Sequence, residues 1–249
     1  MHLSSRTLVI MGLAFVTAHA AAQEVVHDDS ADLVKSIMDN IYGQNYDVRN
    51  ACWPFTWKNS QGEAVDYCMR PGTPHKVDGP AGTMLYLNTF NATDLRDTHY
   101  LYSHFEPGLM GAFKIHVGGQ QGWTFQAIDS GTEYGSAGDC GCVKARFVKL
   151  SNSGDYGWLF ASGGTWQGVT VADYNIVTVV KGRIRDISTI AQVSEAAPGV
   201  KYDVNVKEDP AAKHFFPLHV IKSSKDGQTE EFDVAFDPTT LTYALPAGR

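Results

Sequence analysis

The sequence lacks the short motifs by which many enzymes are recognised. It has no Gly-x-Ser-x-Gly elbow, no His-Glu-x-x-His pair, no Walker loop and no Gly-x-Gly-x-x-Gly after a predicted strand. The ligand spacing of an EF-hand calcium loop is absent as well. We therefore expect no metal and no organic cofactor, and the motifs identify no catalytic residue.

Positive charge is scarce and scattered along the chain. Lysine and arginine number 20 against 27 acidic residues, which gives a formal net charge of −7. A surface that binds nucleic acid or an anionic membrane needs a basic stripe or patch. The charge pattern therefore argues against nucleic acid as a partner.

Long hydrophobic runs are absent except near the N-terminus. Arg6 precedes an apolar stretch at residues 8–16, and the small-residue sequence Ala18-His19-Ala20 follows it. A positive start, an apolar centre and a small-x-small end are the parts of a cleavable signal peptide. The apolar stretch is about half of the ~20 residues that a membrane-spanning helix requires. We expect residues 1–22 to be removed and the mature chain to be soluble, without a membrane span, in the periplasm or outside the cell.

Cysteines are few but even in number: Cys52, Cys68, Cys140 and Cys142. In an oxidising compartment the default expectation for such cysteines is disulfide formation. We favour a Cys52–Cys68 bond, which closes a loop of modest length. Cys140 and Cys142 then either close a tight ring across Gly141, whose ease of reduction would suit a redox role, or pair elsewhere. The sequence leaves the connectivity open.

An N-terminal segment at residues 23–82 is predicted to contain little regular structure. Its exception is a helix over residues 29–42, because Leu33, Ile37 and Ile41 recur at every fourth position. The remainder of the segment carries four of the ten prolines and both early cysteines. We predict that it is irregular and stabilised by a disulfide.

Residues 83–249 are predicted to form an antiparallel β domain, because apolar and polar residues alternate there with a period of two. Turn residues separate the alternating stretches, and no helical pattern lies between them, which indicates a sandwich or a barrel. The Ala-Pro-Gly sequence within residues 196–199 is a candidate subdivision. The predicted strands cover residues 112–117, 123–127, 143–150, 157–161, 175–180, 183–190, 202–206, 215–221 and 230–236.

One candidate site is the sequence from His99 to Glu106, which also contains His104. If this stretch is a strand, His104 and Glu106 share a face, since residues two apart do. Such a pair could bind a metal or act as a base with its orienting partner. Alternating polar residues on a solvent-facing strand give the same pattern.

A second candidate is the Gly-rich stretch at residues 129–140, which carries Asp129, Glu133 and Asp139. Its carboxylates could perform acid–base chemistry on a glycoside or collect a calcium ion. Its glycines would let the backbone approach a ligand. A solvated loop between strands is the alternative interpretation.

Three tryptophans form the third candidate group: Trp123, Trp158 and Trp166. Exposed aromatic side chains on a β surface can stack on sugar rings or anchor a protein partner, although core packing explains most strand tryptophans. Trp166 lies in a polar, Gly-rich stretch at residues 162–168 that we predict to be a turn. A large ring there has little core to reach, so Trp166 is our best candidate for a contact residue.

Together these observations favour a binding protein of the cell envelope over an enzyme, with a protein or an envelope glycan as partner. The alternative is a secreted hydrolase that uses the carboxylates of residues 129–139 or the group of His99, His104 and Glu106. A passive structural role in the envelope is a third hypothesis. The oligomeric state does not follow from the sequence.

The signal peptide makes a direct prediction about the exported protein. Its cleavage sites after Ala20 and after Ala22 predict a mature chain that begins at Ala21 or at Gln23. N-terminal sequencing or intact-mass measurement of the protein from a periplasmic or culture fraction checks this. A chain that still begins at Met1 in that fraction would contradict it.

Overall fold

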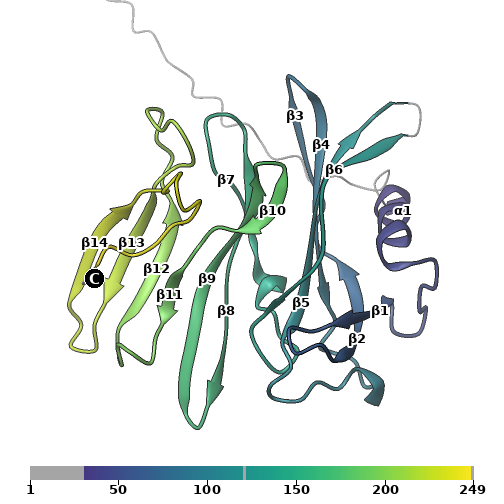
Figure 1. The fold of residues 1–249 in the computed structure, drawn as a ribbon, viewed down its shortest axis with the longest axis horizontal. Coiled ribbons are helices and arrows are strands. Elements are labelled where there is room, and N and C mark those ends of the chain that lie inside the picture. Colours follow the sequence, from purple (N-terminus) through teal and green to yellow (C-terminus); the bar gives the residue numbers. More distant parts are fainter. Residues whose placement is uncertain (1–30, 120–121, 248–249) are drawn as a thin grey trace, which may run out of the picture.

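A computed structural model describes residues 31–119 and 122–247 of the chain. The predicted signal peptide and the first two residues of the predicted helix lie outside these ranges. The described residues form two antiparallel β-sheets and one α-helix, α1 (Ala31–Tyr42), as Figure 1 shows. The predicted fold class, mainly β with a short N-terminal helix, is therefore confirmed.

The N-terminal sheet contains six strands in the order β1-β2-β4-β5-β6, with β3 paired to β4 as well. Neighbouring strands are antiparallel throughout, and most are joined by short turns. The strands are β1 (Trp53–Lys58), β2 (Ala64–Pro71), β3 (His75–Gly79), β4 (Gly82–Asn91), β5 (Gly108–Val117) and β6 (Trp123–Tyr134).

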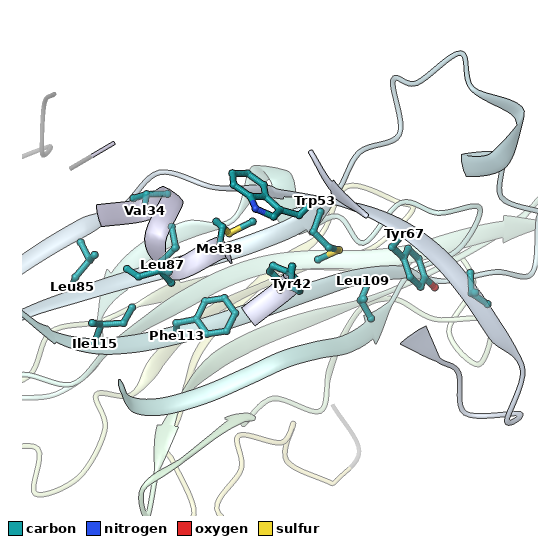
Figure 2. Packing of buried hydrophobic residues seen from close by; sticks show 13 residues of the cluster. Val34, Met38, Tyr42, Trp53, Tyr67, Leu85, Leu87, Leu109, Phe113 and Ile115 are labelled. Carbon is teal, nitrogen blue, oxygen red and sulfur yellow. The ribbon is translucent and has the colours of Figure 1, made fainter. Parts of the chain in front are cut away.

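Helix α1 packs on the apolar face of this sheet. Val34, Ile37, Met38 and Tyr42 lie on one side of the helix, since they follow the three-to-four residue spacing of a helical face, and all four are buried. Figure 2 shows Tyr42 and its neighbours on the helix lying against strand residues such as Phe113. The rings of Tyr42 and Phe113 meet edge to face, with centroids 6.3 Å apart.

The N-terminal sheet curls into a half-barrel, so that its two edge strands, β1 and β6, approach each other. The indole Nε1 of Trp57 donates a hydrogen bond to Glu133 Oε1 over 3.1 Å. The Ser60 N–H donates to the same carboxylate over 3.2 Å. These bonds to a charged acceptor hold the first strand region against the last strand of the sheet.

The C-terminal sheet contains eight strands in the order β14-β13-β12-β11-β9-β8-β7, with β10 paired to β9. It lies beside the N-terminal sheet in Figure 1 and has its own core, which includes Ile176, Val220 and Tyr243. The strands are β7 (Arg146–Lys149), β8 (Tyr156–Trp166), β9 (Val169–Val180), β10 (Arg183–Asp186), β11 (Ile190–Val193), β12 (Lys201–Val206), β13 (Leu218–Ser223) and β14 (Thr229–Val234).

The predicted strands at residues 112–127, 143–161, 175–190 and 215–236 all pair as hairpins, with changes in their ends. Strands β5 and β6 pair from Val117 opposite Trp123, and both extend further than predicted. Strands β9 and β10 turn at Lys181-Gly182, where both residues have positive φ, 50° and 76°. That conformation belongs to the two-residue turns that match the twist of a hairpin.

The prediction that residues 44–82 are irregular was wrong, because this segment supplies β1, β2 and β3. Pro54 lies in an edge strand and Pro71 is the last residue of its strand. Proline is tolerated at both places because it removes few ladder hydrogen bonds there. The prolines therefore mark an edge and an end of the sheet, where we took them as signs of irregular structure.

Both disulfides join the cysteines that are nearest in sequence. Cys52 and Cys68 are bonded with their Cα atoms 5.4 Å apart, as we favoured. Cys140 and Cys142 are bonded across Gly141 with a Cα separation of 5.1 Å. Loop-closure entropy assigns about 3 kcal/mol to the first bond and about half of that to the second, because the second closes a much shorter loop. The Cys140–Cys142 bond therefore acts mainly on the local shape of its loop.

A polar contact inside the half-barrel gives a stability prediction. The Tyr42 hydroxyl lies 2.6 Å from Oγ1 of the fully buried Thr89 and donates to the Ser130 carbonyl over 3.1 Å. Tyr42→Phe leaves the Thr89 hydroxyl without this partner, which should cost about 1–3 kcal/mol. We expect the melting temperature to fall by about 2–4 °C per kcal/mol.

The matched control is Tyr46→Phe, because Tyr46 is 36% exposed and sits on the surface near the helix. We expect that substitution to change the unfolding free energy by less than about 0.5 kcal/mol. Thermal or urea unfolding of the two variants measures the difference. Equal stability of both variants would show that the Tyr42 hydroxyl carries no stabilising bond.

Candidate functional site

The two sheets meet around the connection between β6 and β7. This connection is a tight loop at residues 135–142 followed by a short 3-10 helix, η2 (Cys142–Lys144). Two glycines let it pass between the sheets. A Cβ at Gly108 would overlap the backbone of Cys140, and one at Gly141, whose φ is 67°, would overlap the carbonyl of Ala161. Only glycine fits such close approaches of backbone to backbone.

Asn91 fastens this loop to the N-terminal sheet. Its side chain is 1% exposed, accepts a hydrogen bond from the Leu109 N–H over 2.7 Å and donates to the Gly138 carbonyl over 2.8 Å. The Gly138 N–H in turn donates to the Glu106 carbonyl over 2.9 Å. A buried amide with both ends bonded fixes one geometry. The loop therefore has a defined position at the junction of the sheets.

A hollow of about 510 Å³ opens beside this loop, and we call it the first hollow. This volume lies within the range of small-molecule sites. Its walls come from the β2–β3 connection, from β4, from η2 and β7, and from β8. The lining residues are Pro71, Gly72, Thr73, Pro74, His75, Asn88, Phe90, Val143, Ala145, Phe147 and Trp158.

Aromatic rings form one wall of the first hollow, with Phe147 at the centre. The His75 ring is stacked on Phe147 with centroids 4.1 Å apart and planes within 5°. Tyr156 is stacked on the same ring at 5.3 Å, and Tyr86 and Trp158 lie against it at 5.2 and 5.7 Å. Burial lowers the pKa of His75, so the imidazole is neutral at neutral pH. The lining residues of this hollow include no Asp, Glu, Lys or Arg, so the hollow is uncharged.

Two polar groups at this wall have no partner among the residues that the structure describes. The Asn88 side chain is 6% exposed, lines the hollow and makes no hydrogen bond to another described residue. The indole Nε1 of Trp158 is enclosed and lacks a hydrogen-bond partner within the described ranges. A buried polar group left without a partner costs about 1–3 kcal/mol. The Trp158 N–H carries such a cost and is closed off from the hollow, whereas the Asn88 amide reaches the hollow and is free to bind a ligand there.

A second hollow of about 460 Å³ adjoins the first, and Val143 lines both. It lies between the tight loop and β8. Its lining residues are Thr93, Asp139, Gly141, Val143, Lys144, Ala161, Ser162 and Gly163. We call the two hollows together the junction trough.

The second hollow is more polar than the first. Lys144 is exposed and has no ion-pair partner among the described residues. Asp139 is also exposed, and its Oδ1 accepts a hydrogen bond from the Gly141 N–H over 2.8 Å. The Ser162 hydroxyl donates to Asn175 Oδ1 over 2.6 Å, which leaves its oxygen free to accept. This hollow thus offers one cation, one anion and hydroxyl groups.

The segment from His99 to Glu106 is not the strand on which the first candidate site depended. It consists of the end of a 3-10 helix, η1 (Thr98–Tyr100), followed by an irregular loop. His104 Nε2 lies 2.9 Å from the Thr165 carbonyl, Glu106 accepts a hydrogen bond from the Ser103 N–H, and His99 faces Asp66 at 3.1 Å. Three different partners engage these side chains, so the expected shared face does not form.

The stretch at residues 129–140 is also not one loop, because its first half belongs to β6. Asp129 accepts a hydrogen bond from the Thr132 hydroxyl over 2.7 Å. Glu133 accepts the hydrogen bond from Trp57 that joins the edges of the half-barrel. Asp139 lies in the tight loop and lines the second hollow. Of the three predicted acidic residues, one therefore reaches the trough.

Trp166 lies at the end of β8, and the polar turn predicted around it is a strand up to this residue. Only Gln167 and Gly168 form the turn, and Trp166 pairs with Val169 across it. The ring is half-buried because it folds back over Gly164, where a Cβ would overlap it. An aromatic ring that covers a glycine of its own strand has a packing role, and Trp166 does not line the trough.

Sequence reasoning did not find most of the residues that line the trough. Asn88 and Phe147 are ordinary strand residues in the sequence, and His75 lies in a segment predicted to be irregular. One sequence feature could have pointed to the trough: Pro71 and Pro74 flank a short turn and make it rigid. Trp158 was among the candidate tryptophans, and it is the one at the trough.

Comparison with family models, with curated proteins and with solved structures finds no match to this chain. Among the described residues, no group of three or more His, Cys, Asp or Glu side chains could hold a metal ion. Within the same ranges, no helix has the length and apolar character needed to cross a membrane. The trough is therefore interpreted from its own chemistry.

The stacked His75 ring predicts a pH-dependent stability. Because its pKa is lowered in the folded state, the native protein binds fewer protons here than the unfolded chain as the pH falls below about 6.5. The contribution of His75 to the unfolding free energy is therefore complete above about pH 6.5, and it is lost as the pH falls below that value.

His75→Phe keeps a ring on Phe147 and removes the titration. We expect the variant to become more stable relative to the wild type as the pH is lowered from 7 to about 5. Urea unfolding at a series of pH values measures this. Parallel curves for both proteins would contradict the burial of a neutral imidazole.

Proposed function

We propose that the protein is an extracytoplasmic binding protein whose ligand is a neutral sugar unit of an envelope glycan, held in the first hollow. The observation that carries the proposal is the Asn88 amide. It makes no hydrogen bond to another described residue, and it reaches a hollow lined mostly by uncharged rings, prolines and small side chains. This combination suits a ligand with one apolar face and several hydroxyl groups.

The rings that line the first hollow support this assignment. Half-buried Phe90 and His75 line the hollow, and a sugar ring presents its C–H groups to such aromatic surface. The Asn88 amide can both donate to and accept from a hydroxyl. A neutral hollow also disfavours ligands that would bring an unpaired charge into a partly buried site.

The extracytoplasmic location is supported by two independent features. The N-terminal sequence has the parts of a cleavable signal peptide. The four cysteines form two disulfides, which are typical of oxidising compartments and rare in the cytosol.

Binding without hydrolysis agrees best with the groups at the trough. Most glycosidases place two carboxylates on either side of the scissile bond. Asp139 is the single carboxylate among the residues that line the two hollows. Asp129 and Glu133 bond to groups within the N-terminal sheet, and Glu106 bonds within its own loop. No observation favours the hydrolase alternative.

Titration calorimetry with neutral tetrasaccharides tests the proposal. The probes are the tetramers of N-acetylglucosamine, of β-1,4-glucose and of α-1,4-glucose. We expect one of them to bind the wild type, and we expect Asn88→Leu, which keeps the volume and deletes the amide, to weaken it about 5–30-fold. Asn88→Asp is a second variant, because it keeps the shape and removes the donor.

The matched control is Asn40→Leu on the exposed side of α1, away from the trough. It should bind the same probe as tightly as the wild type does. Either of two results sinks the proposal: none of the tetrasaccharides binds at millimolar concentration, or folded Asn88 variants bind as tightly as the control.

A further inference from the structure

We infer that the ligand is a linear chain that occupies the whole junction trough, with one unit in the first hollow and the following unit in the second. This inference rests on the proposed function, and it adds a second binding subsite with a different chemistry. The residues that define the subsite are Thr93, Asp139, Lys144 and Ser162.

The two hollows lie in series along β8 and past the end of β4. From β4 the lining passes from Asn88 in the first hollow to Thr93, two residues beyond the strand, in the second. On β8 it passes from Trp158 to Ser162 in the same chain direction. A strand advances about 3.3 Å per residue, so the lining residues from Trp158 to Ser162 on β8 are spaced over roughly 13 Å. Val143 lines both hollows and joins them. One sugar ring fills only part of such a trough.

Hydrogen-bonding chemistry distinguishes a glycan from a peptide in the second hollow. Asp139 can only accept hydrogen bonds, Lys144 can only donate them, and Thr93 can do both. A sugar hydroxyl also does both, so each of these groups finds a match on one unit. A proline-rich peptide, the other ligand that suits aromatic grooves, has no N–H at proline and leaves Asp139 unmatched. The second hollow therefore favours the glycan.

The Cys140–Cys142 disulfide supports the subsite by fixing the residues around it. The bond closes a ring around Gly141, which lines the second hollow, and Asp139 and Val143 flank the two cysteines. Both cysteines are almost fully buried, at 1% and 0% exposure. Buried sulfurs are protected from attack by thiols, because reactive cysteines are accessible. The bond thus acts as a clip that shapes the loop.

Ligand length is the direct test of two subsites. Calorimetry with the dimer and the tetramer of N-acetylglucosamine, of β-1,4-glucose and of α-1,4-glucose compares occupation of one hollow with occupation of both. For the sugar that binds, we expect the tetramer to bind at least about tenfold more tightly than the dimer. A ten-residue polyproline peptide serves as the competing probe.

Substitutions distinguish the contributions of the two hollows to binding. Asp139→Asn keeps the acceptor for the Gly141 N–H and removes the charge, and Lys144→Met removes the cation. We expect both to weaken the tetramer about 3–10-fold and to leave the dimer unchanged, whereas Asn88→Leu weakens both. Asp226→Asn and Lys58→Met are the controls. Asp226 is exposed and makes the same type of bond, to the Gln228 N–H, at a distant turn.

Other results of these titrations would contradict the two-subsite inference alone or the proposed function as well. Equal affinities for dimer and tetramer, both lowered by Asn88→Leu, would overturn the two-subsite inference and leave the proposed function standing. The same holds if Asp139→Asn and Lys144→Met weaken dimer and tetramer alike. If no sugar binds, or if only the polyproline peptide binds and Asn88→Leu abolishes that binding, the inference and the proposed glycan function both fall.

Discussion

The hydrogen bonds of the Asn91 side chain are the constraint on which the rest of the site depends. Asn91 ends β4, and its amide joins the Leu109 N–H of the next strand to the Gly138 carbonyl of the tight loop. Every later feature of the junction follows from the position of this loop. The loop sets the direction in which the chain leaves the half-barrel, and η2 after it supplies Val143 to both hollows. A buried amide can do this because water does not compete for its bonds.

The two sheets form opposite sides of the trough around this loop. The N-terminal sheet closes on α1 and gives the rigid side of the trough through β4 and the Pro-rich turn before β3. The C-terminal sheet gives the other side through β7 and β8, whose rings pack around Phe147. Residues distant in sequence therefore meet at the trough, and their chemistry changes along it from apolar and neutral to polar and charged. We connect this gradient to a chain-like ligand, since successive units then meet different partners.

The sequence predicted the fold class well and the candidate site poorly, for physical reasons. Alternating patterns report directly on strands with one buried face, so the hairpin at Lys181-Gly182 and the long pair β5–β6 were found. Proline at a sheet edge looks the same in sequence as proline in a loop, so the strand containing Pro54 was missed. A site is assembled by strand pairing, and neighbours in sequence say little about it. Asp139 and Trp158 were the two candidate residues that reached the trough, and Trp166 folds over Gly164 because that glycine leaves room for its ring.

We propose a neutral glycan chain, bound in the junction trough between the two sheets, as the ligand of this protein. A crystal structure of the protein soaked with the tetrasaccharide that binds in solution tests this most directly. We expect one sugar ring within hydrogen-bonding distance of Asn88 and against Phe90, with the next ring beside Asp139 and Lys144 past Val143. Sugar density at another surface, with the trough unchanged and unoccupied in the same crystal, would contradict it.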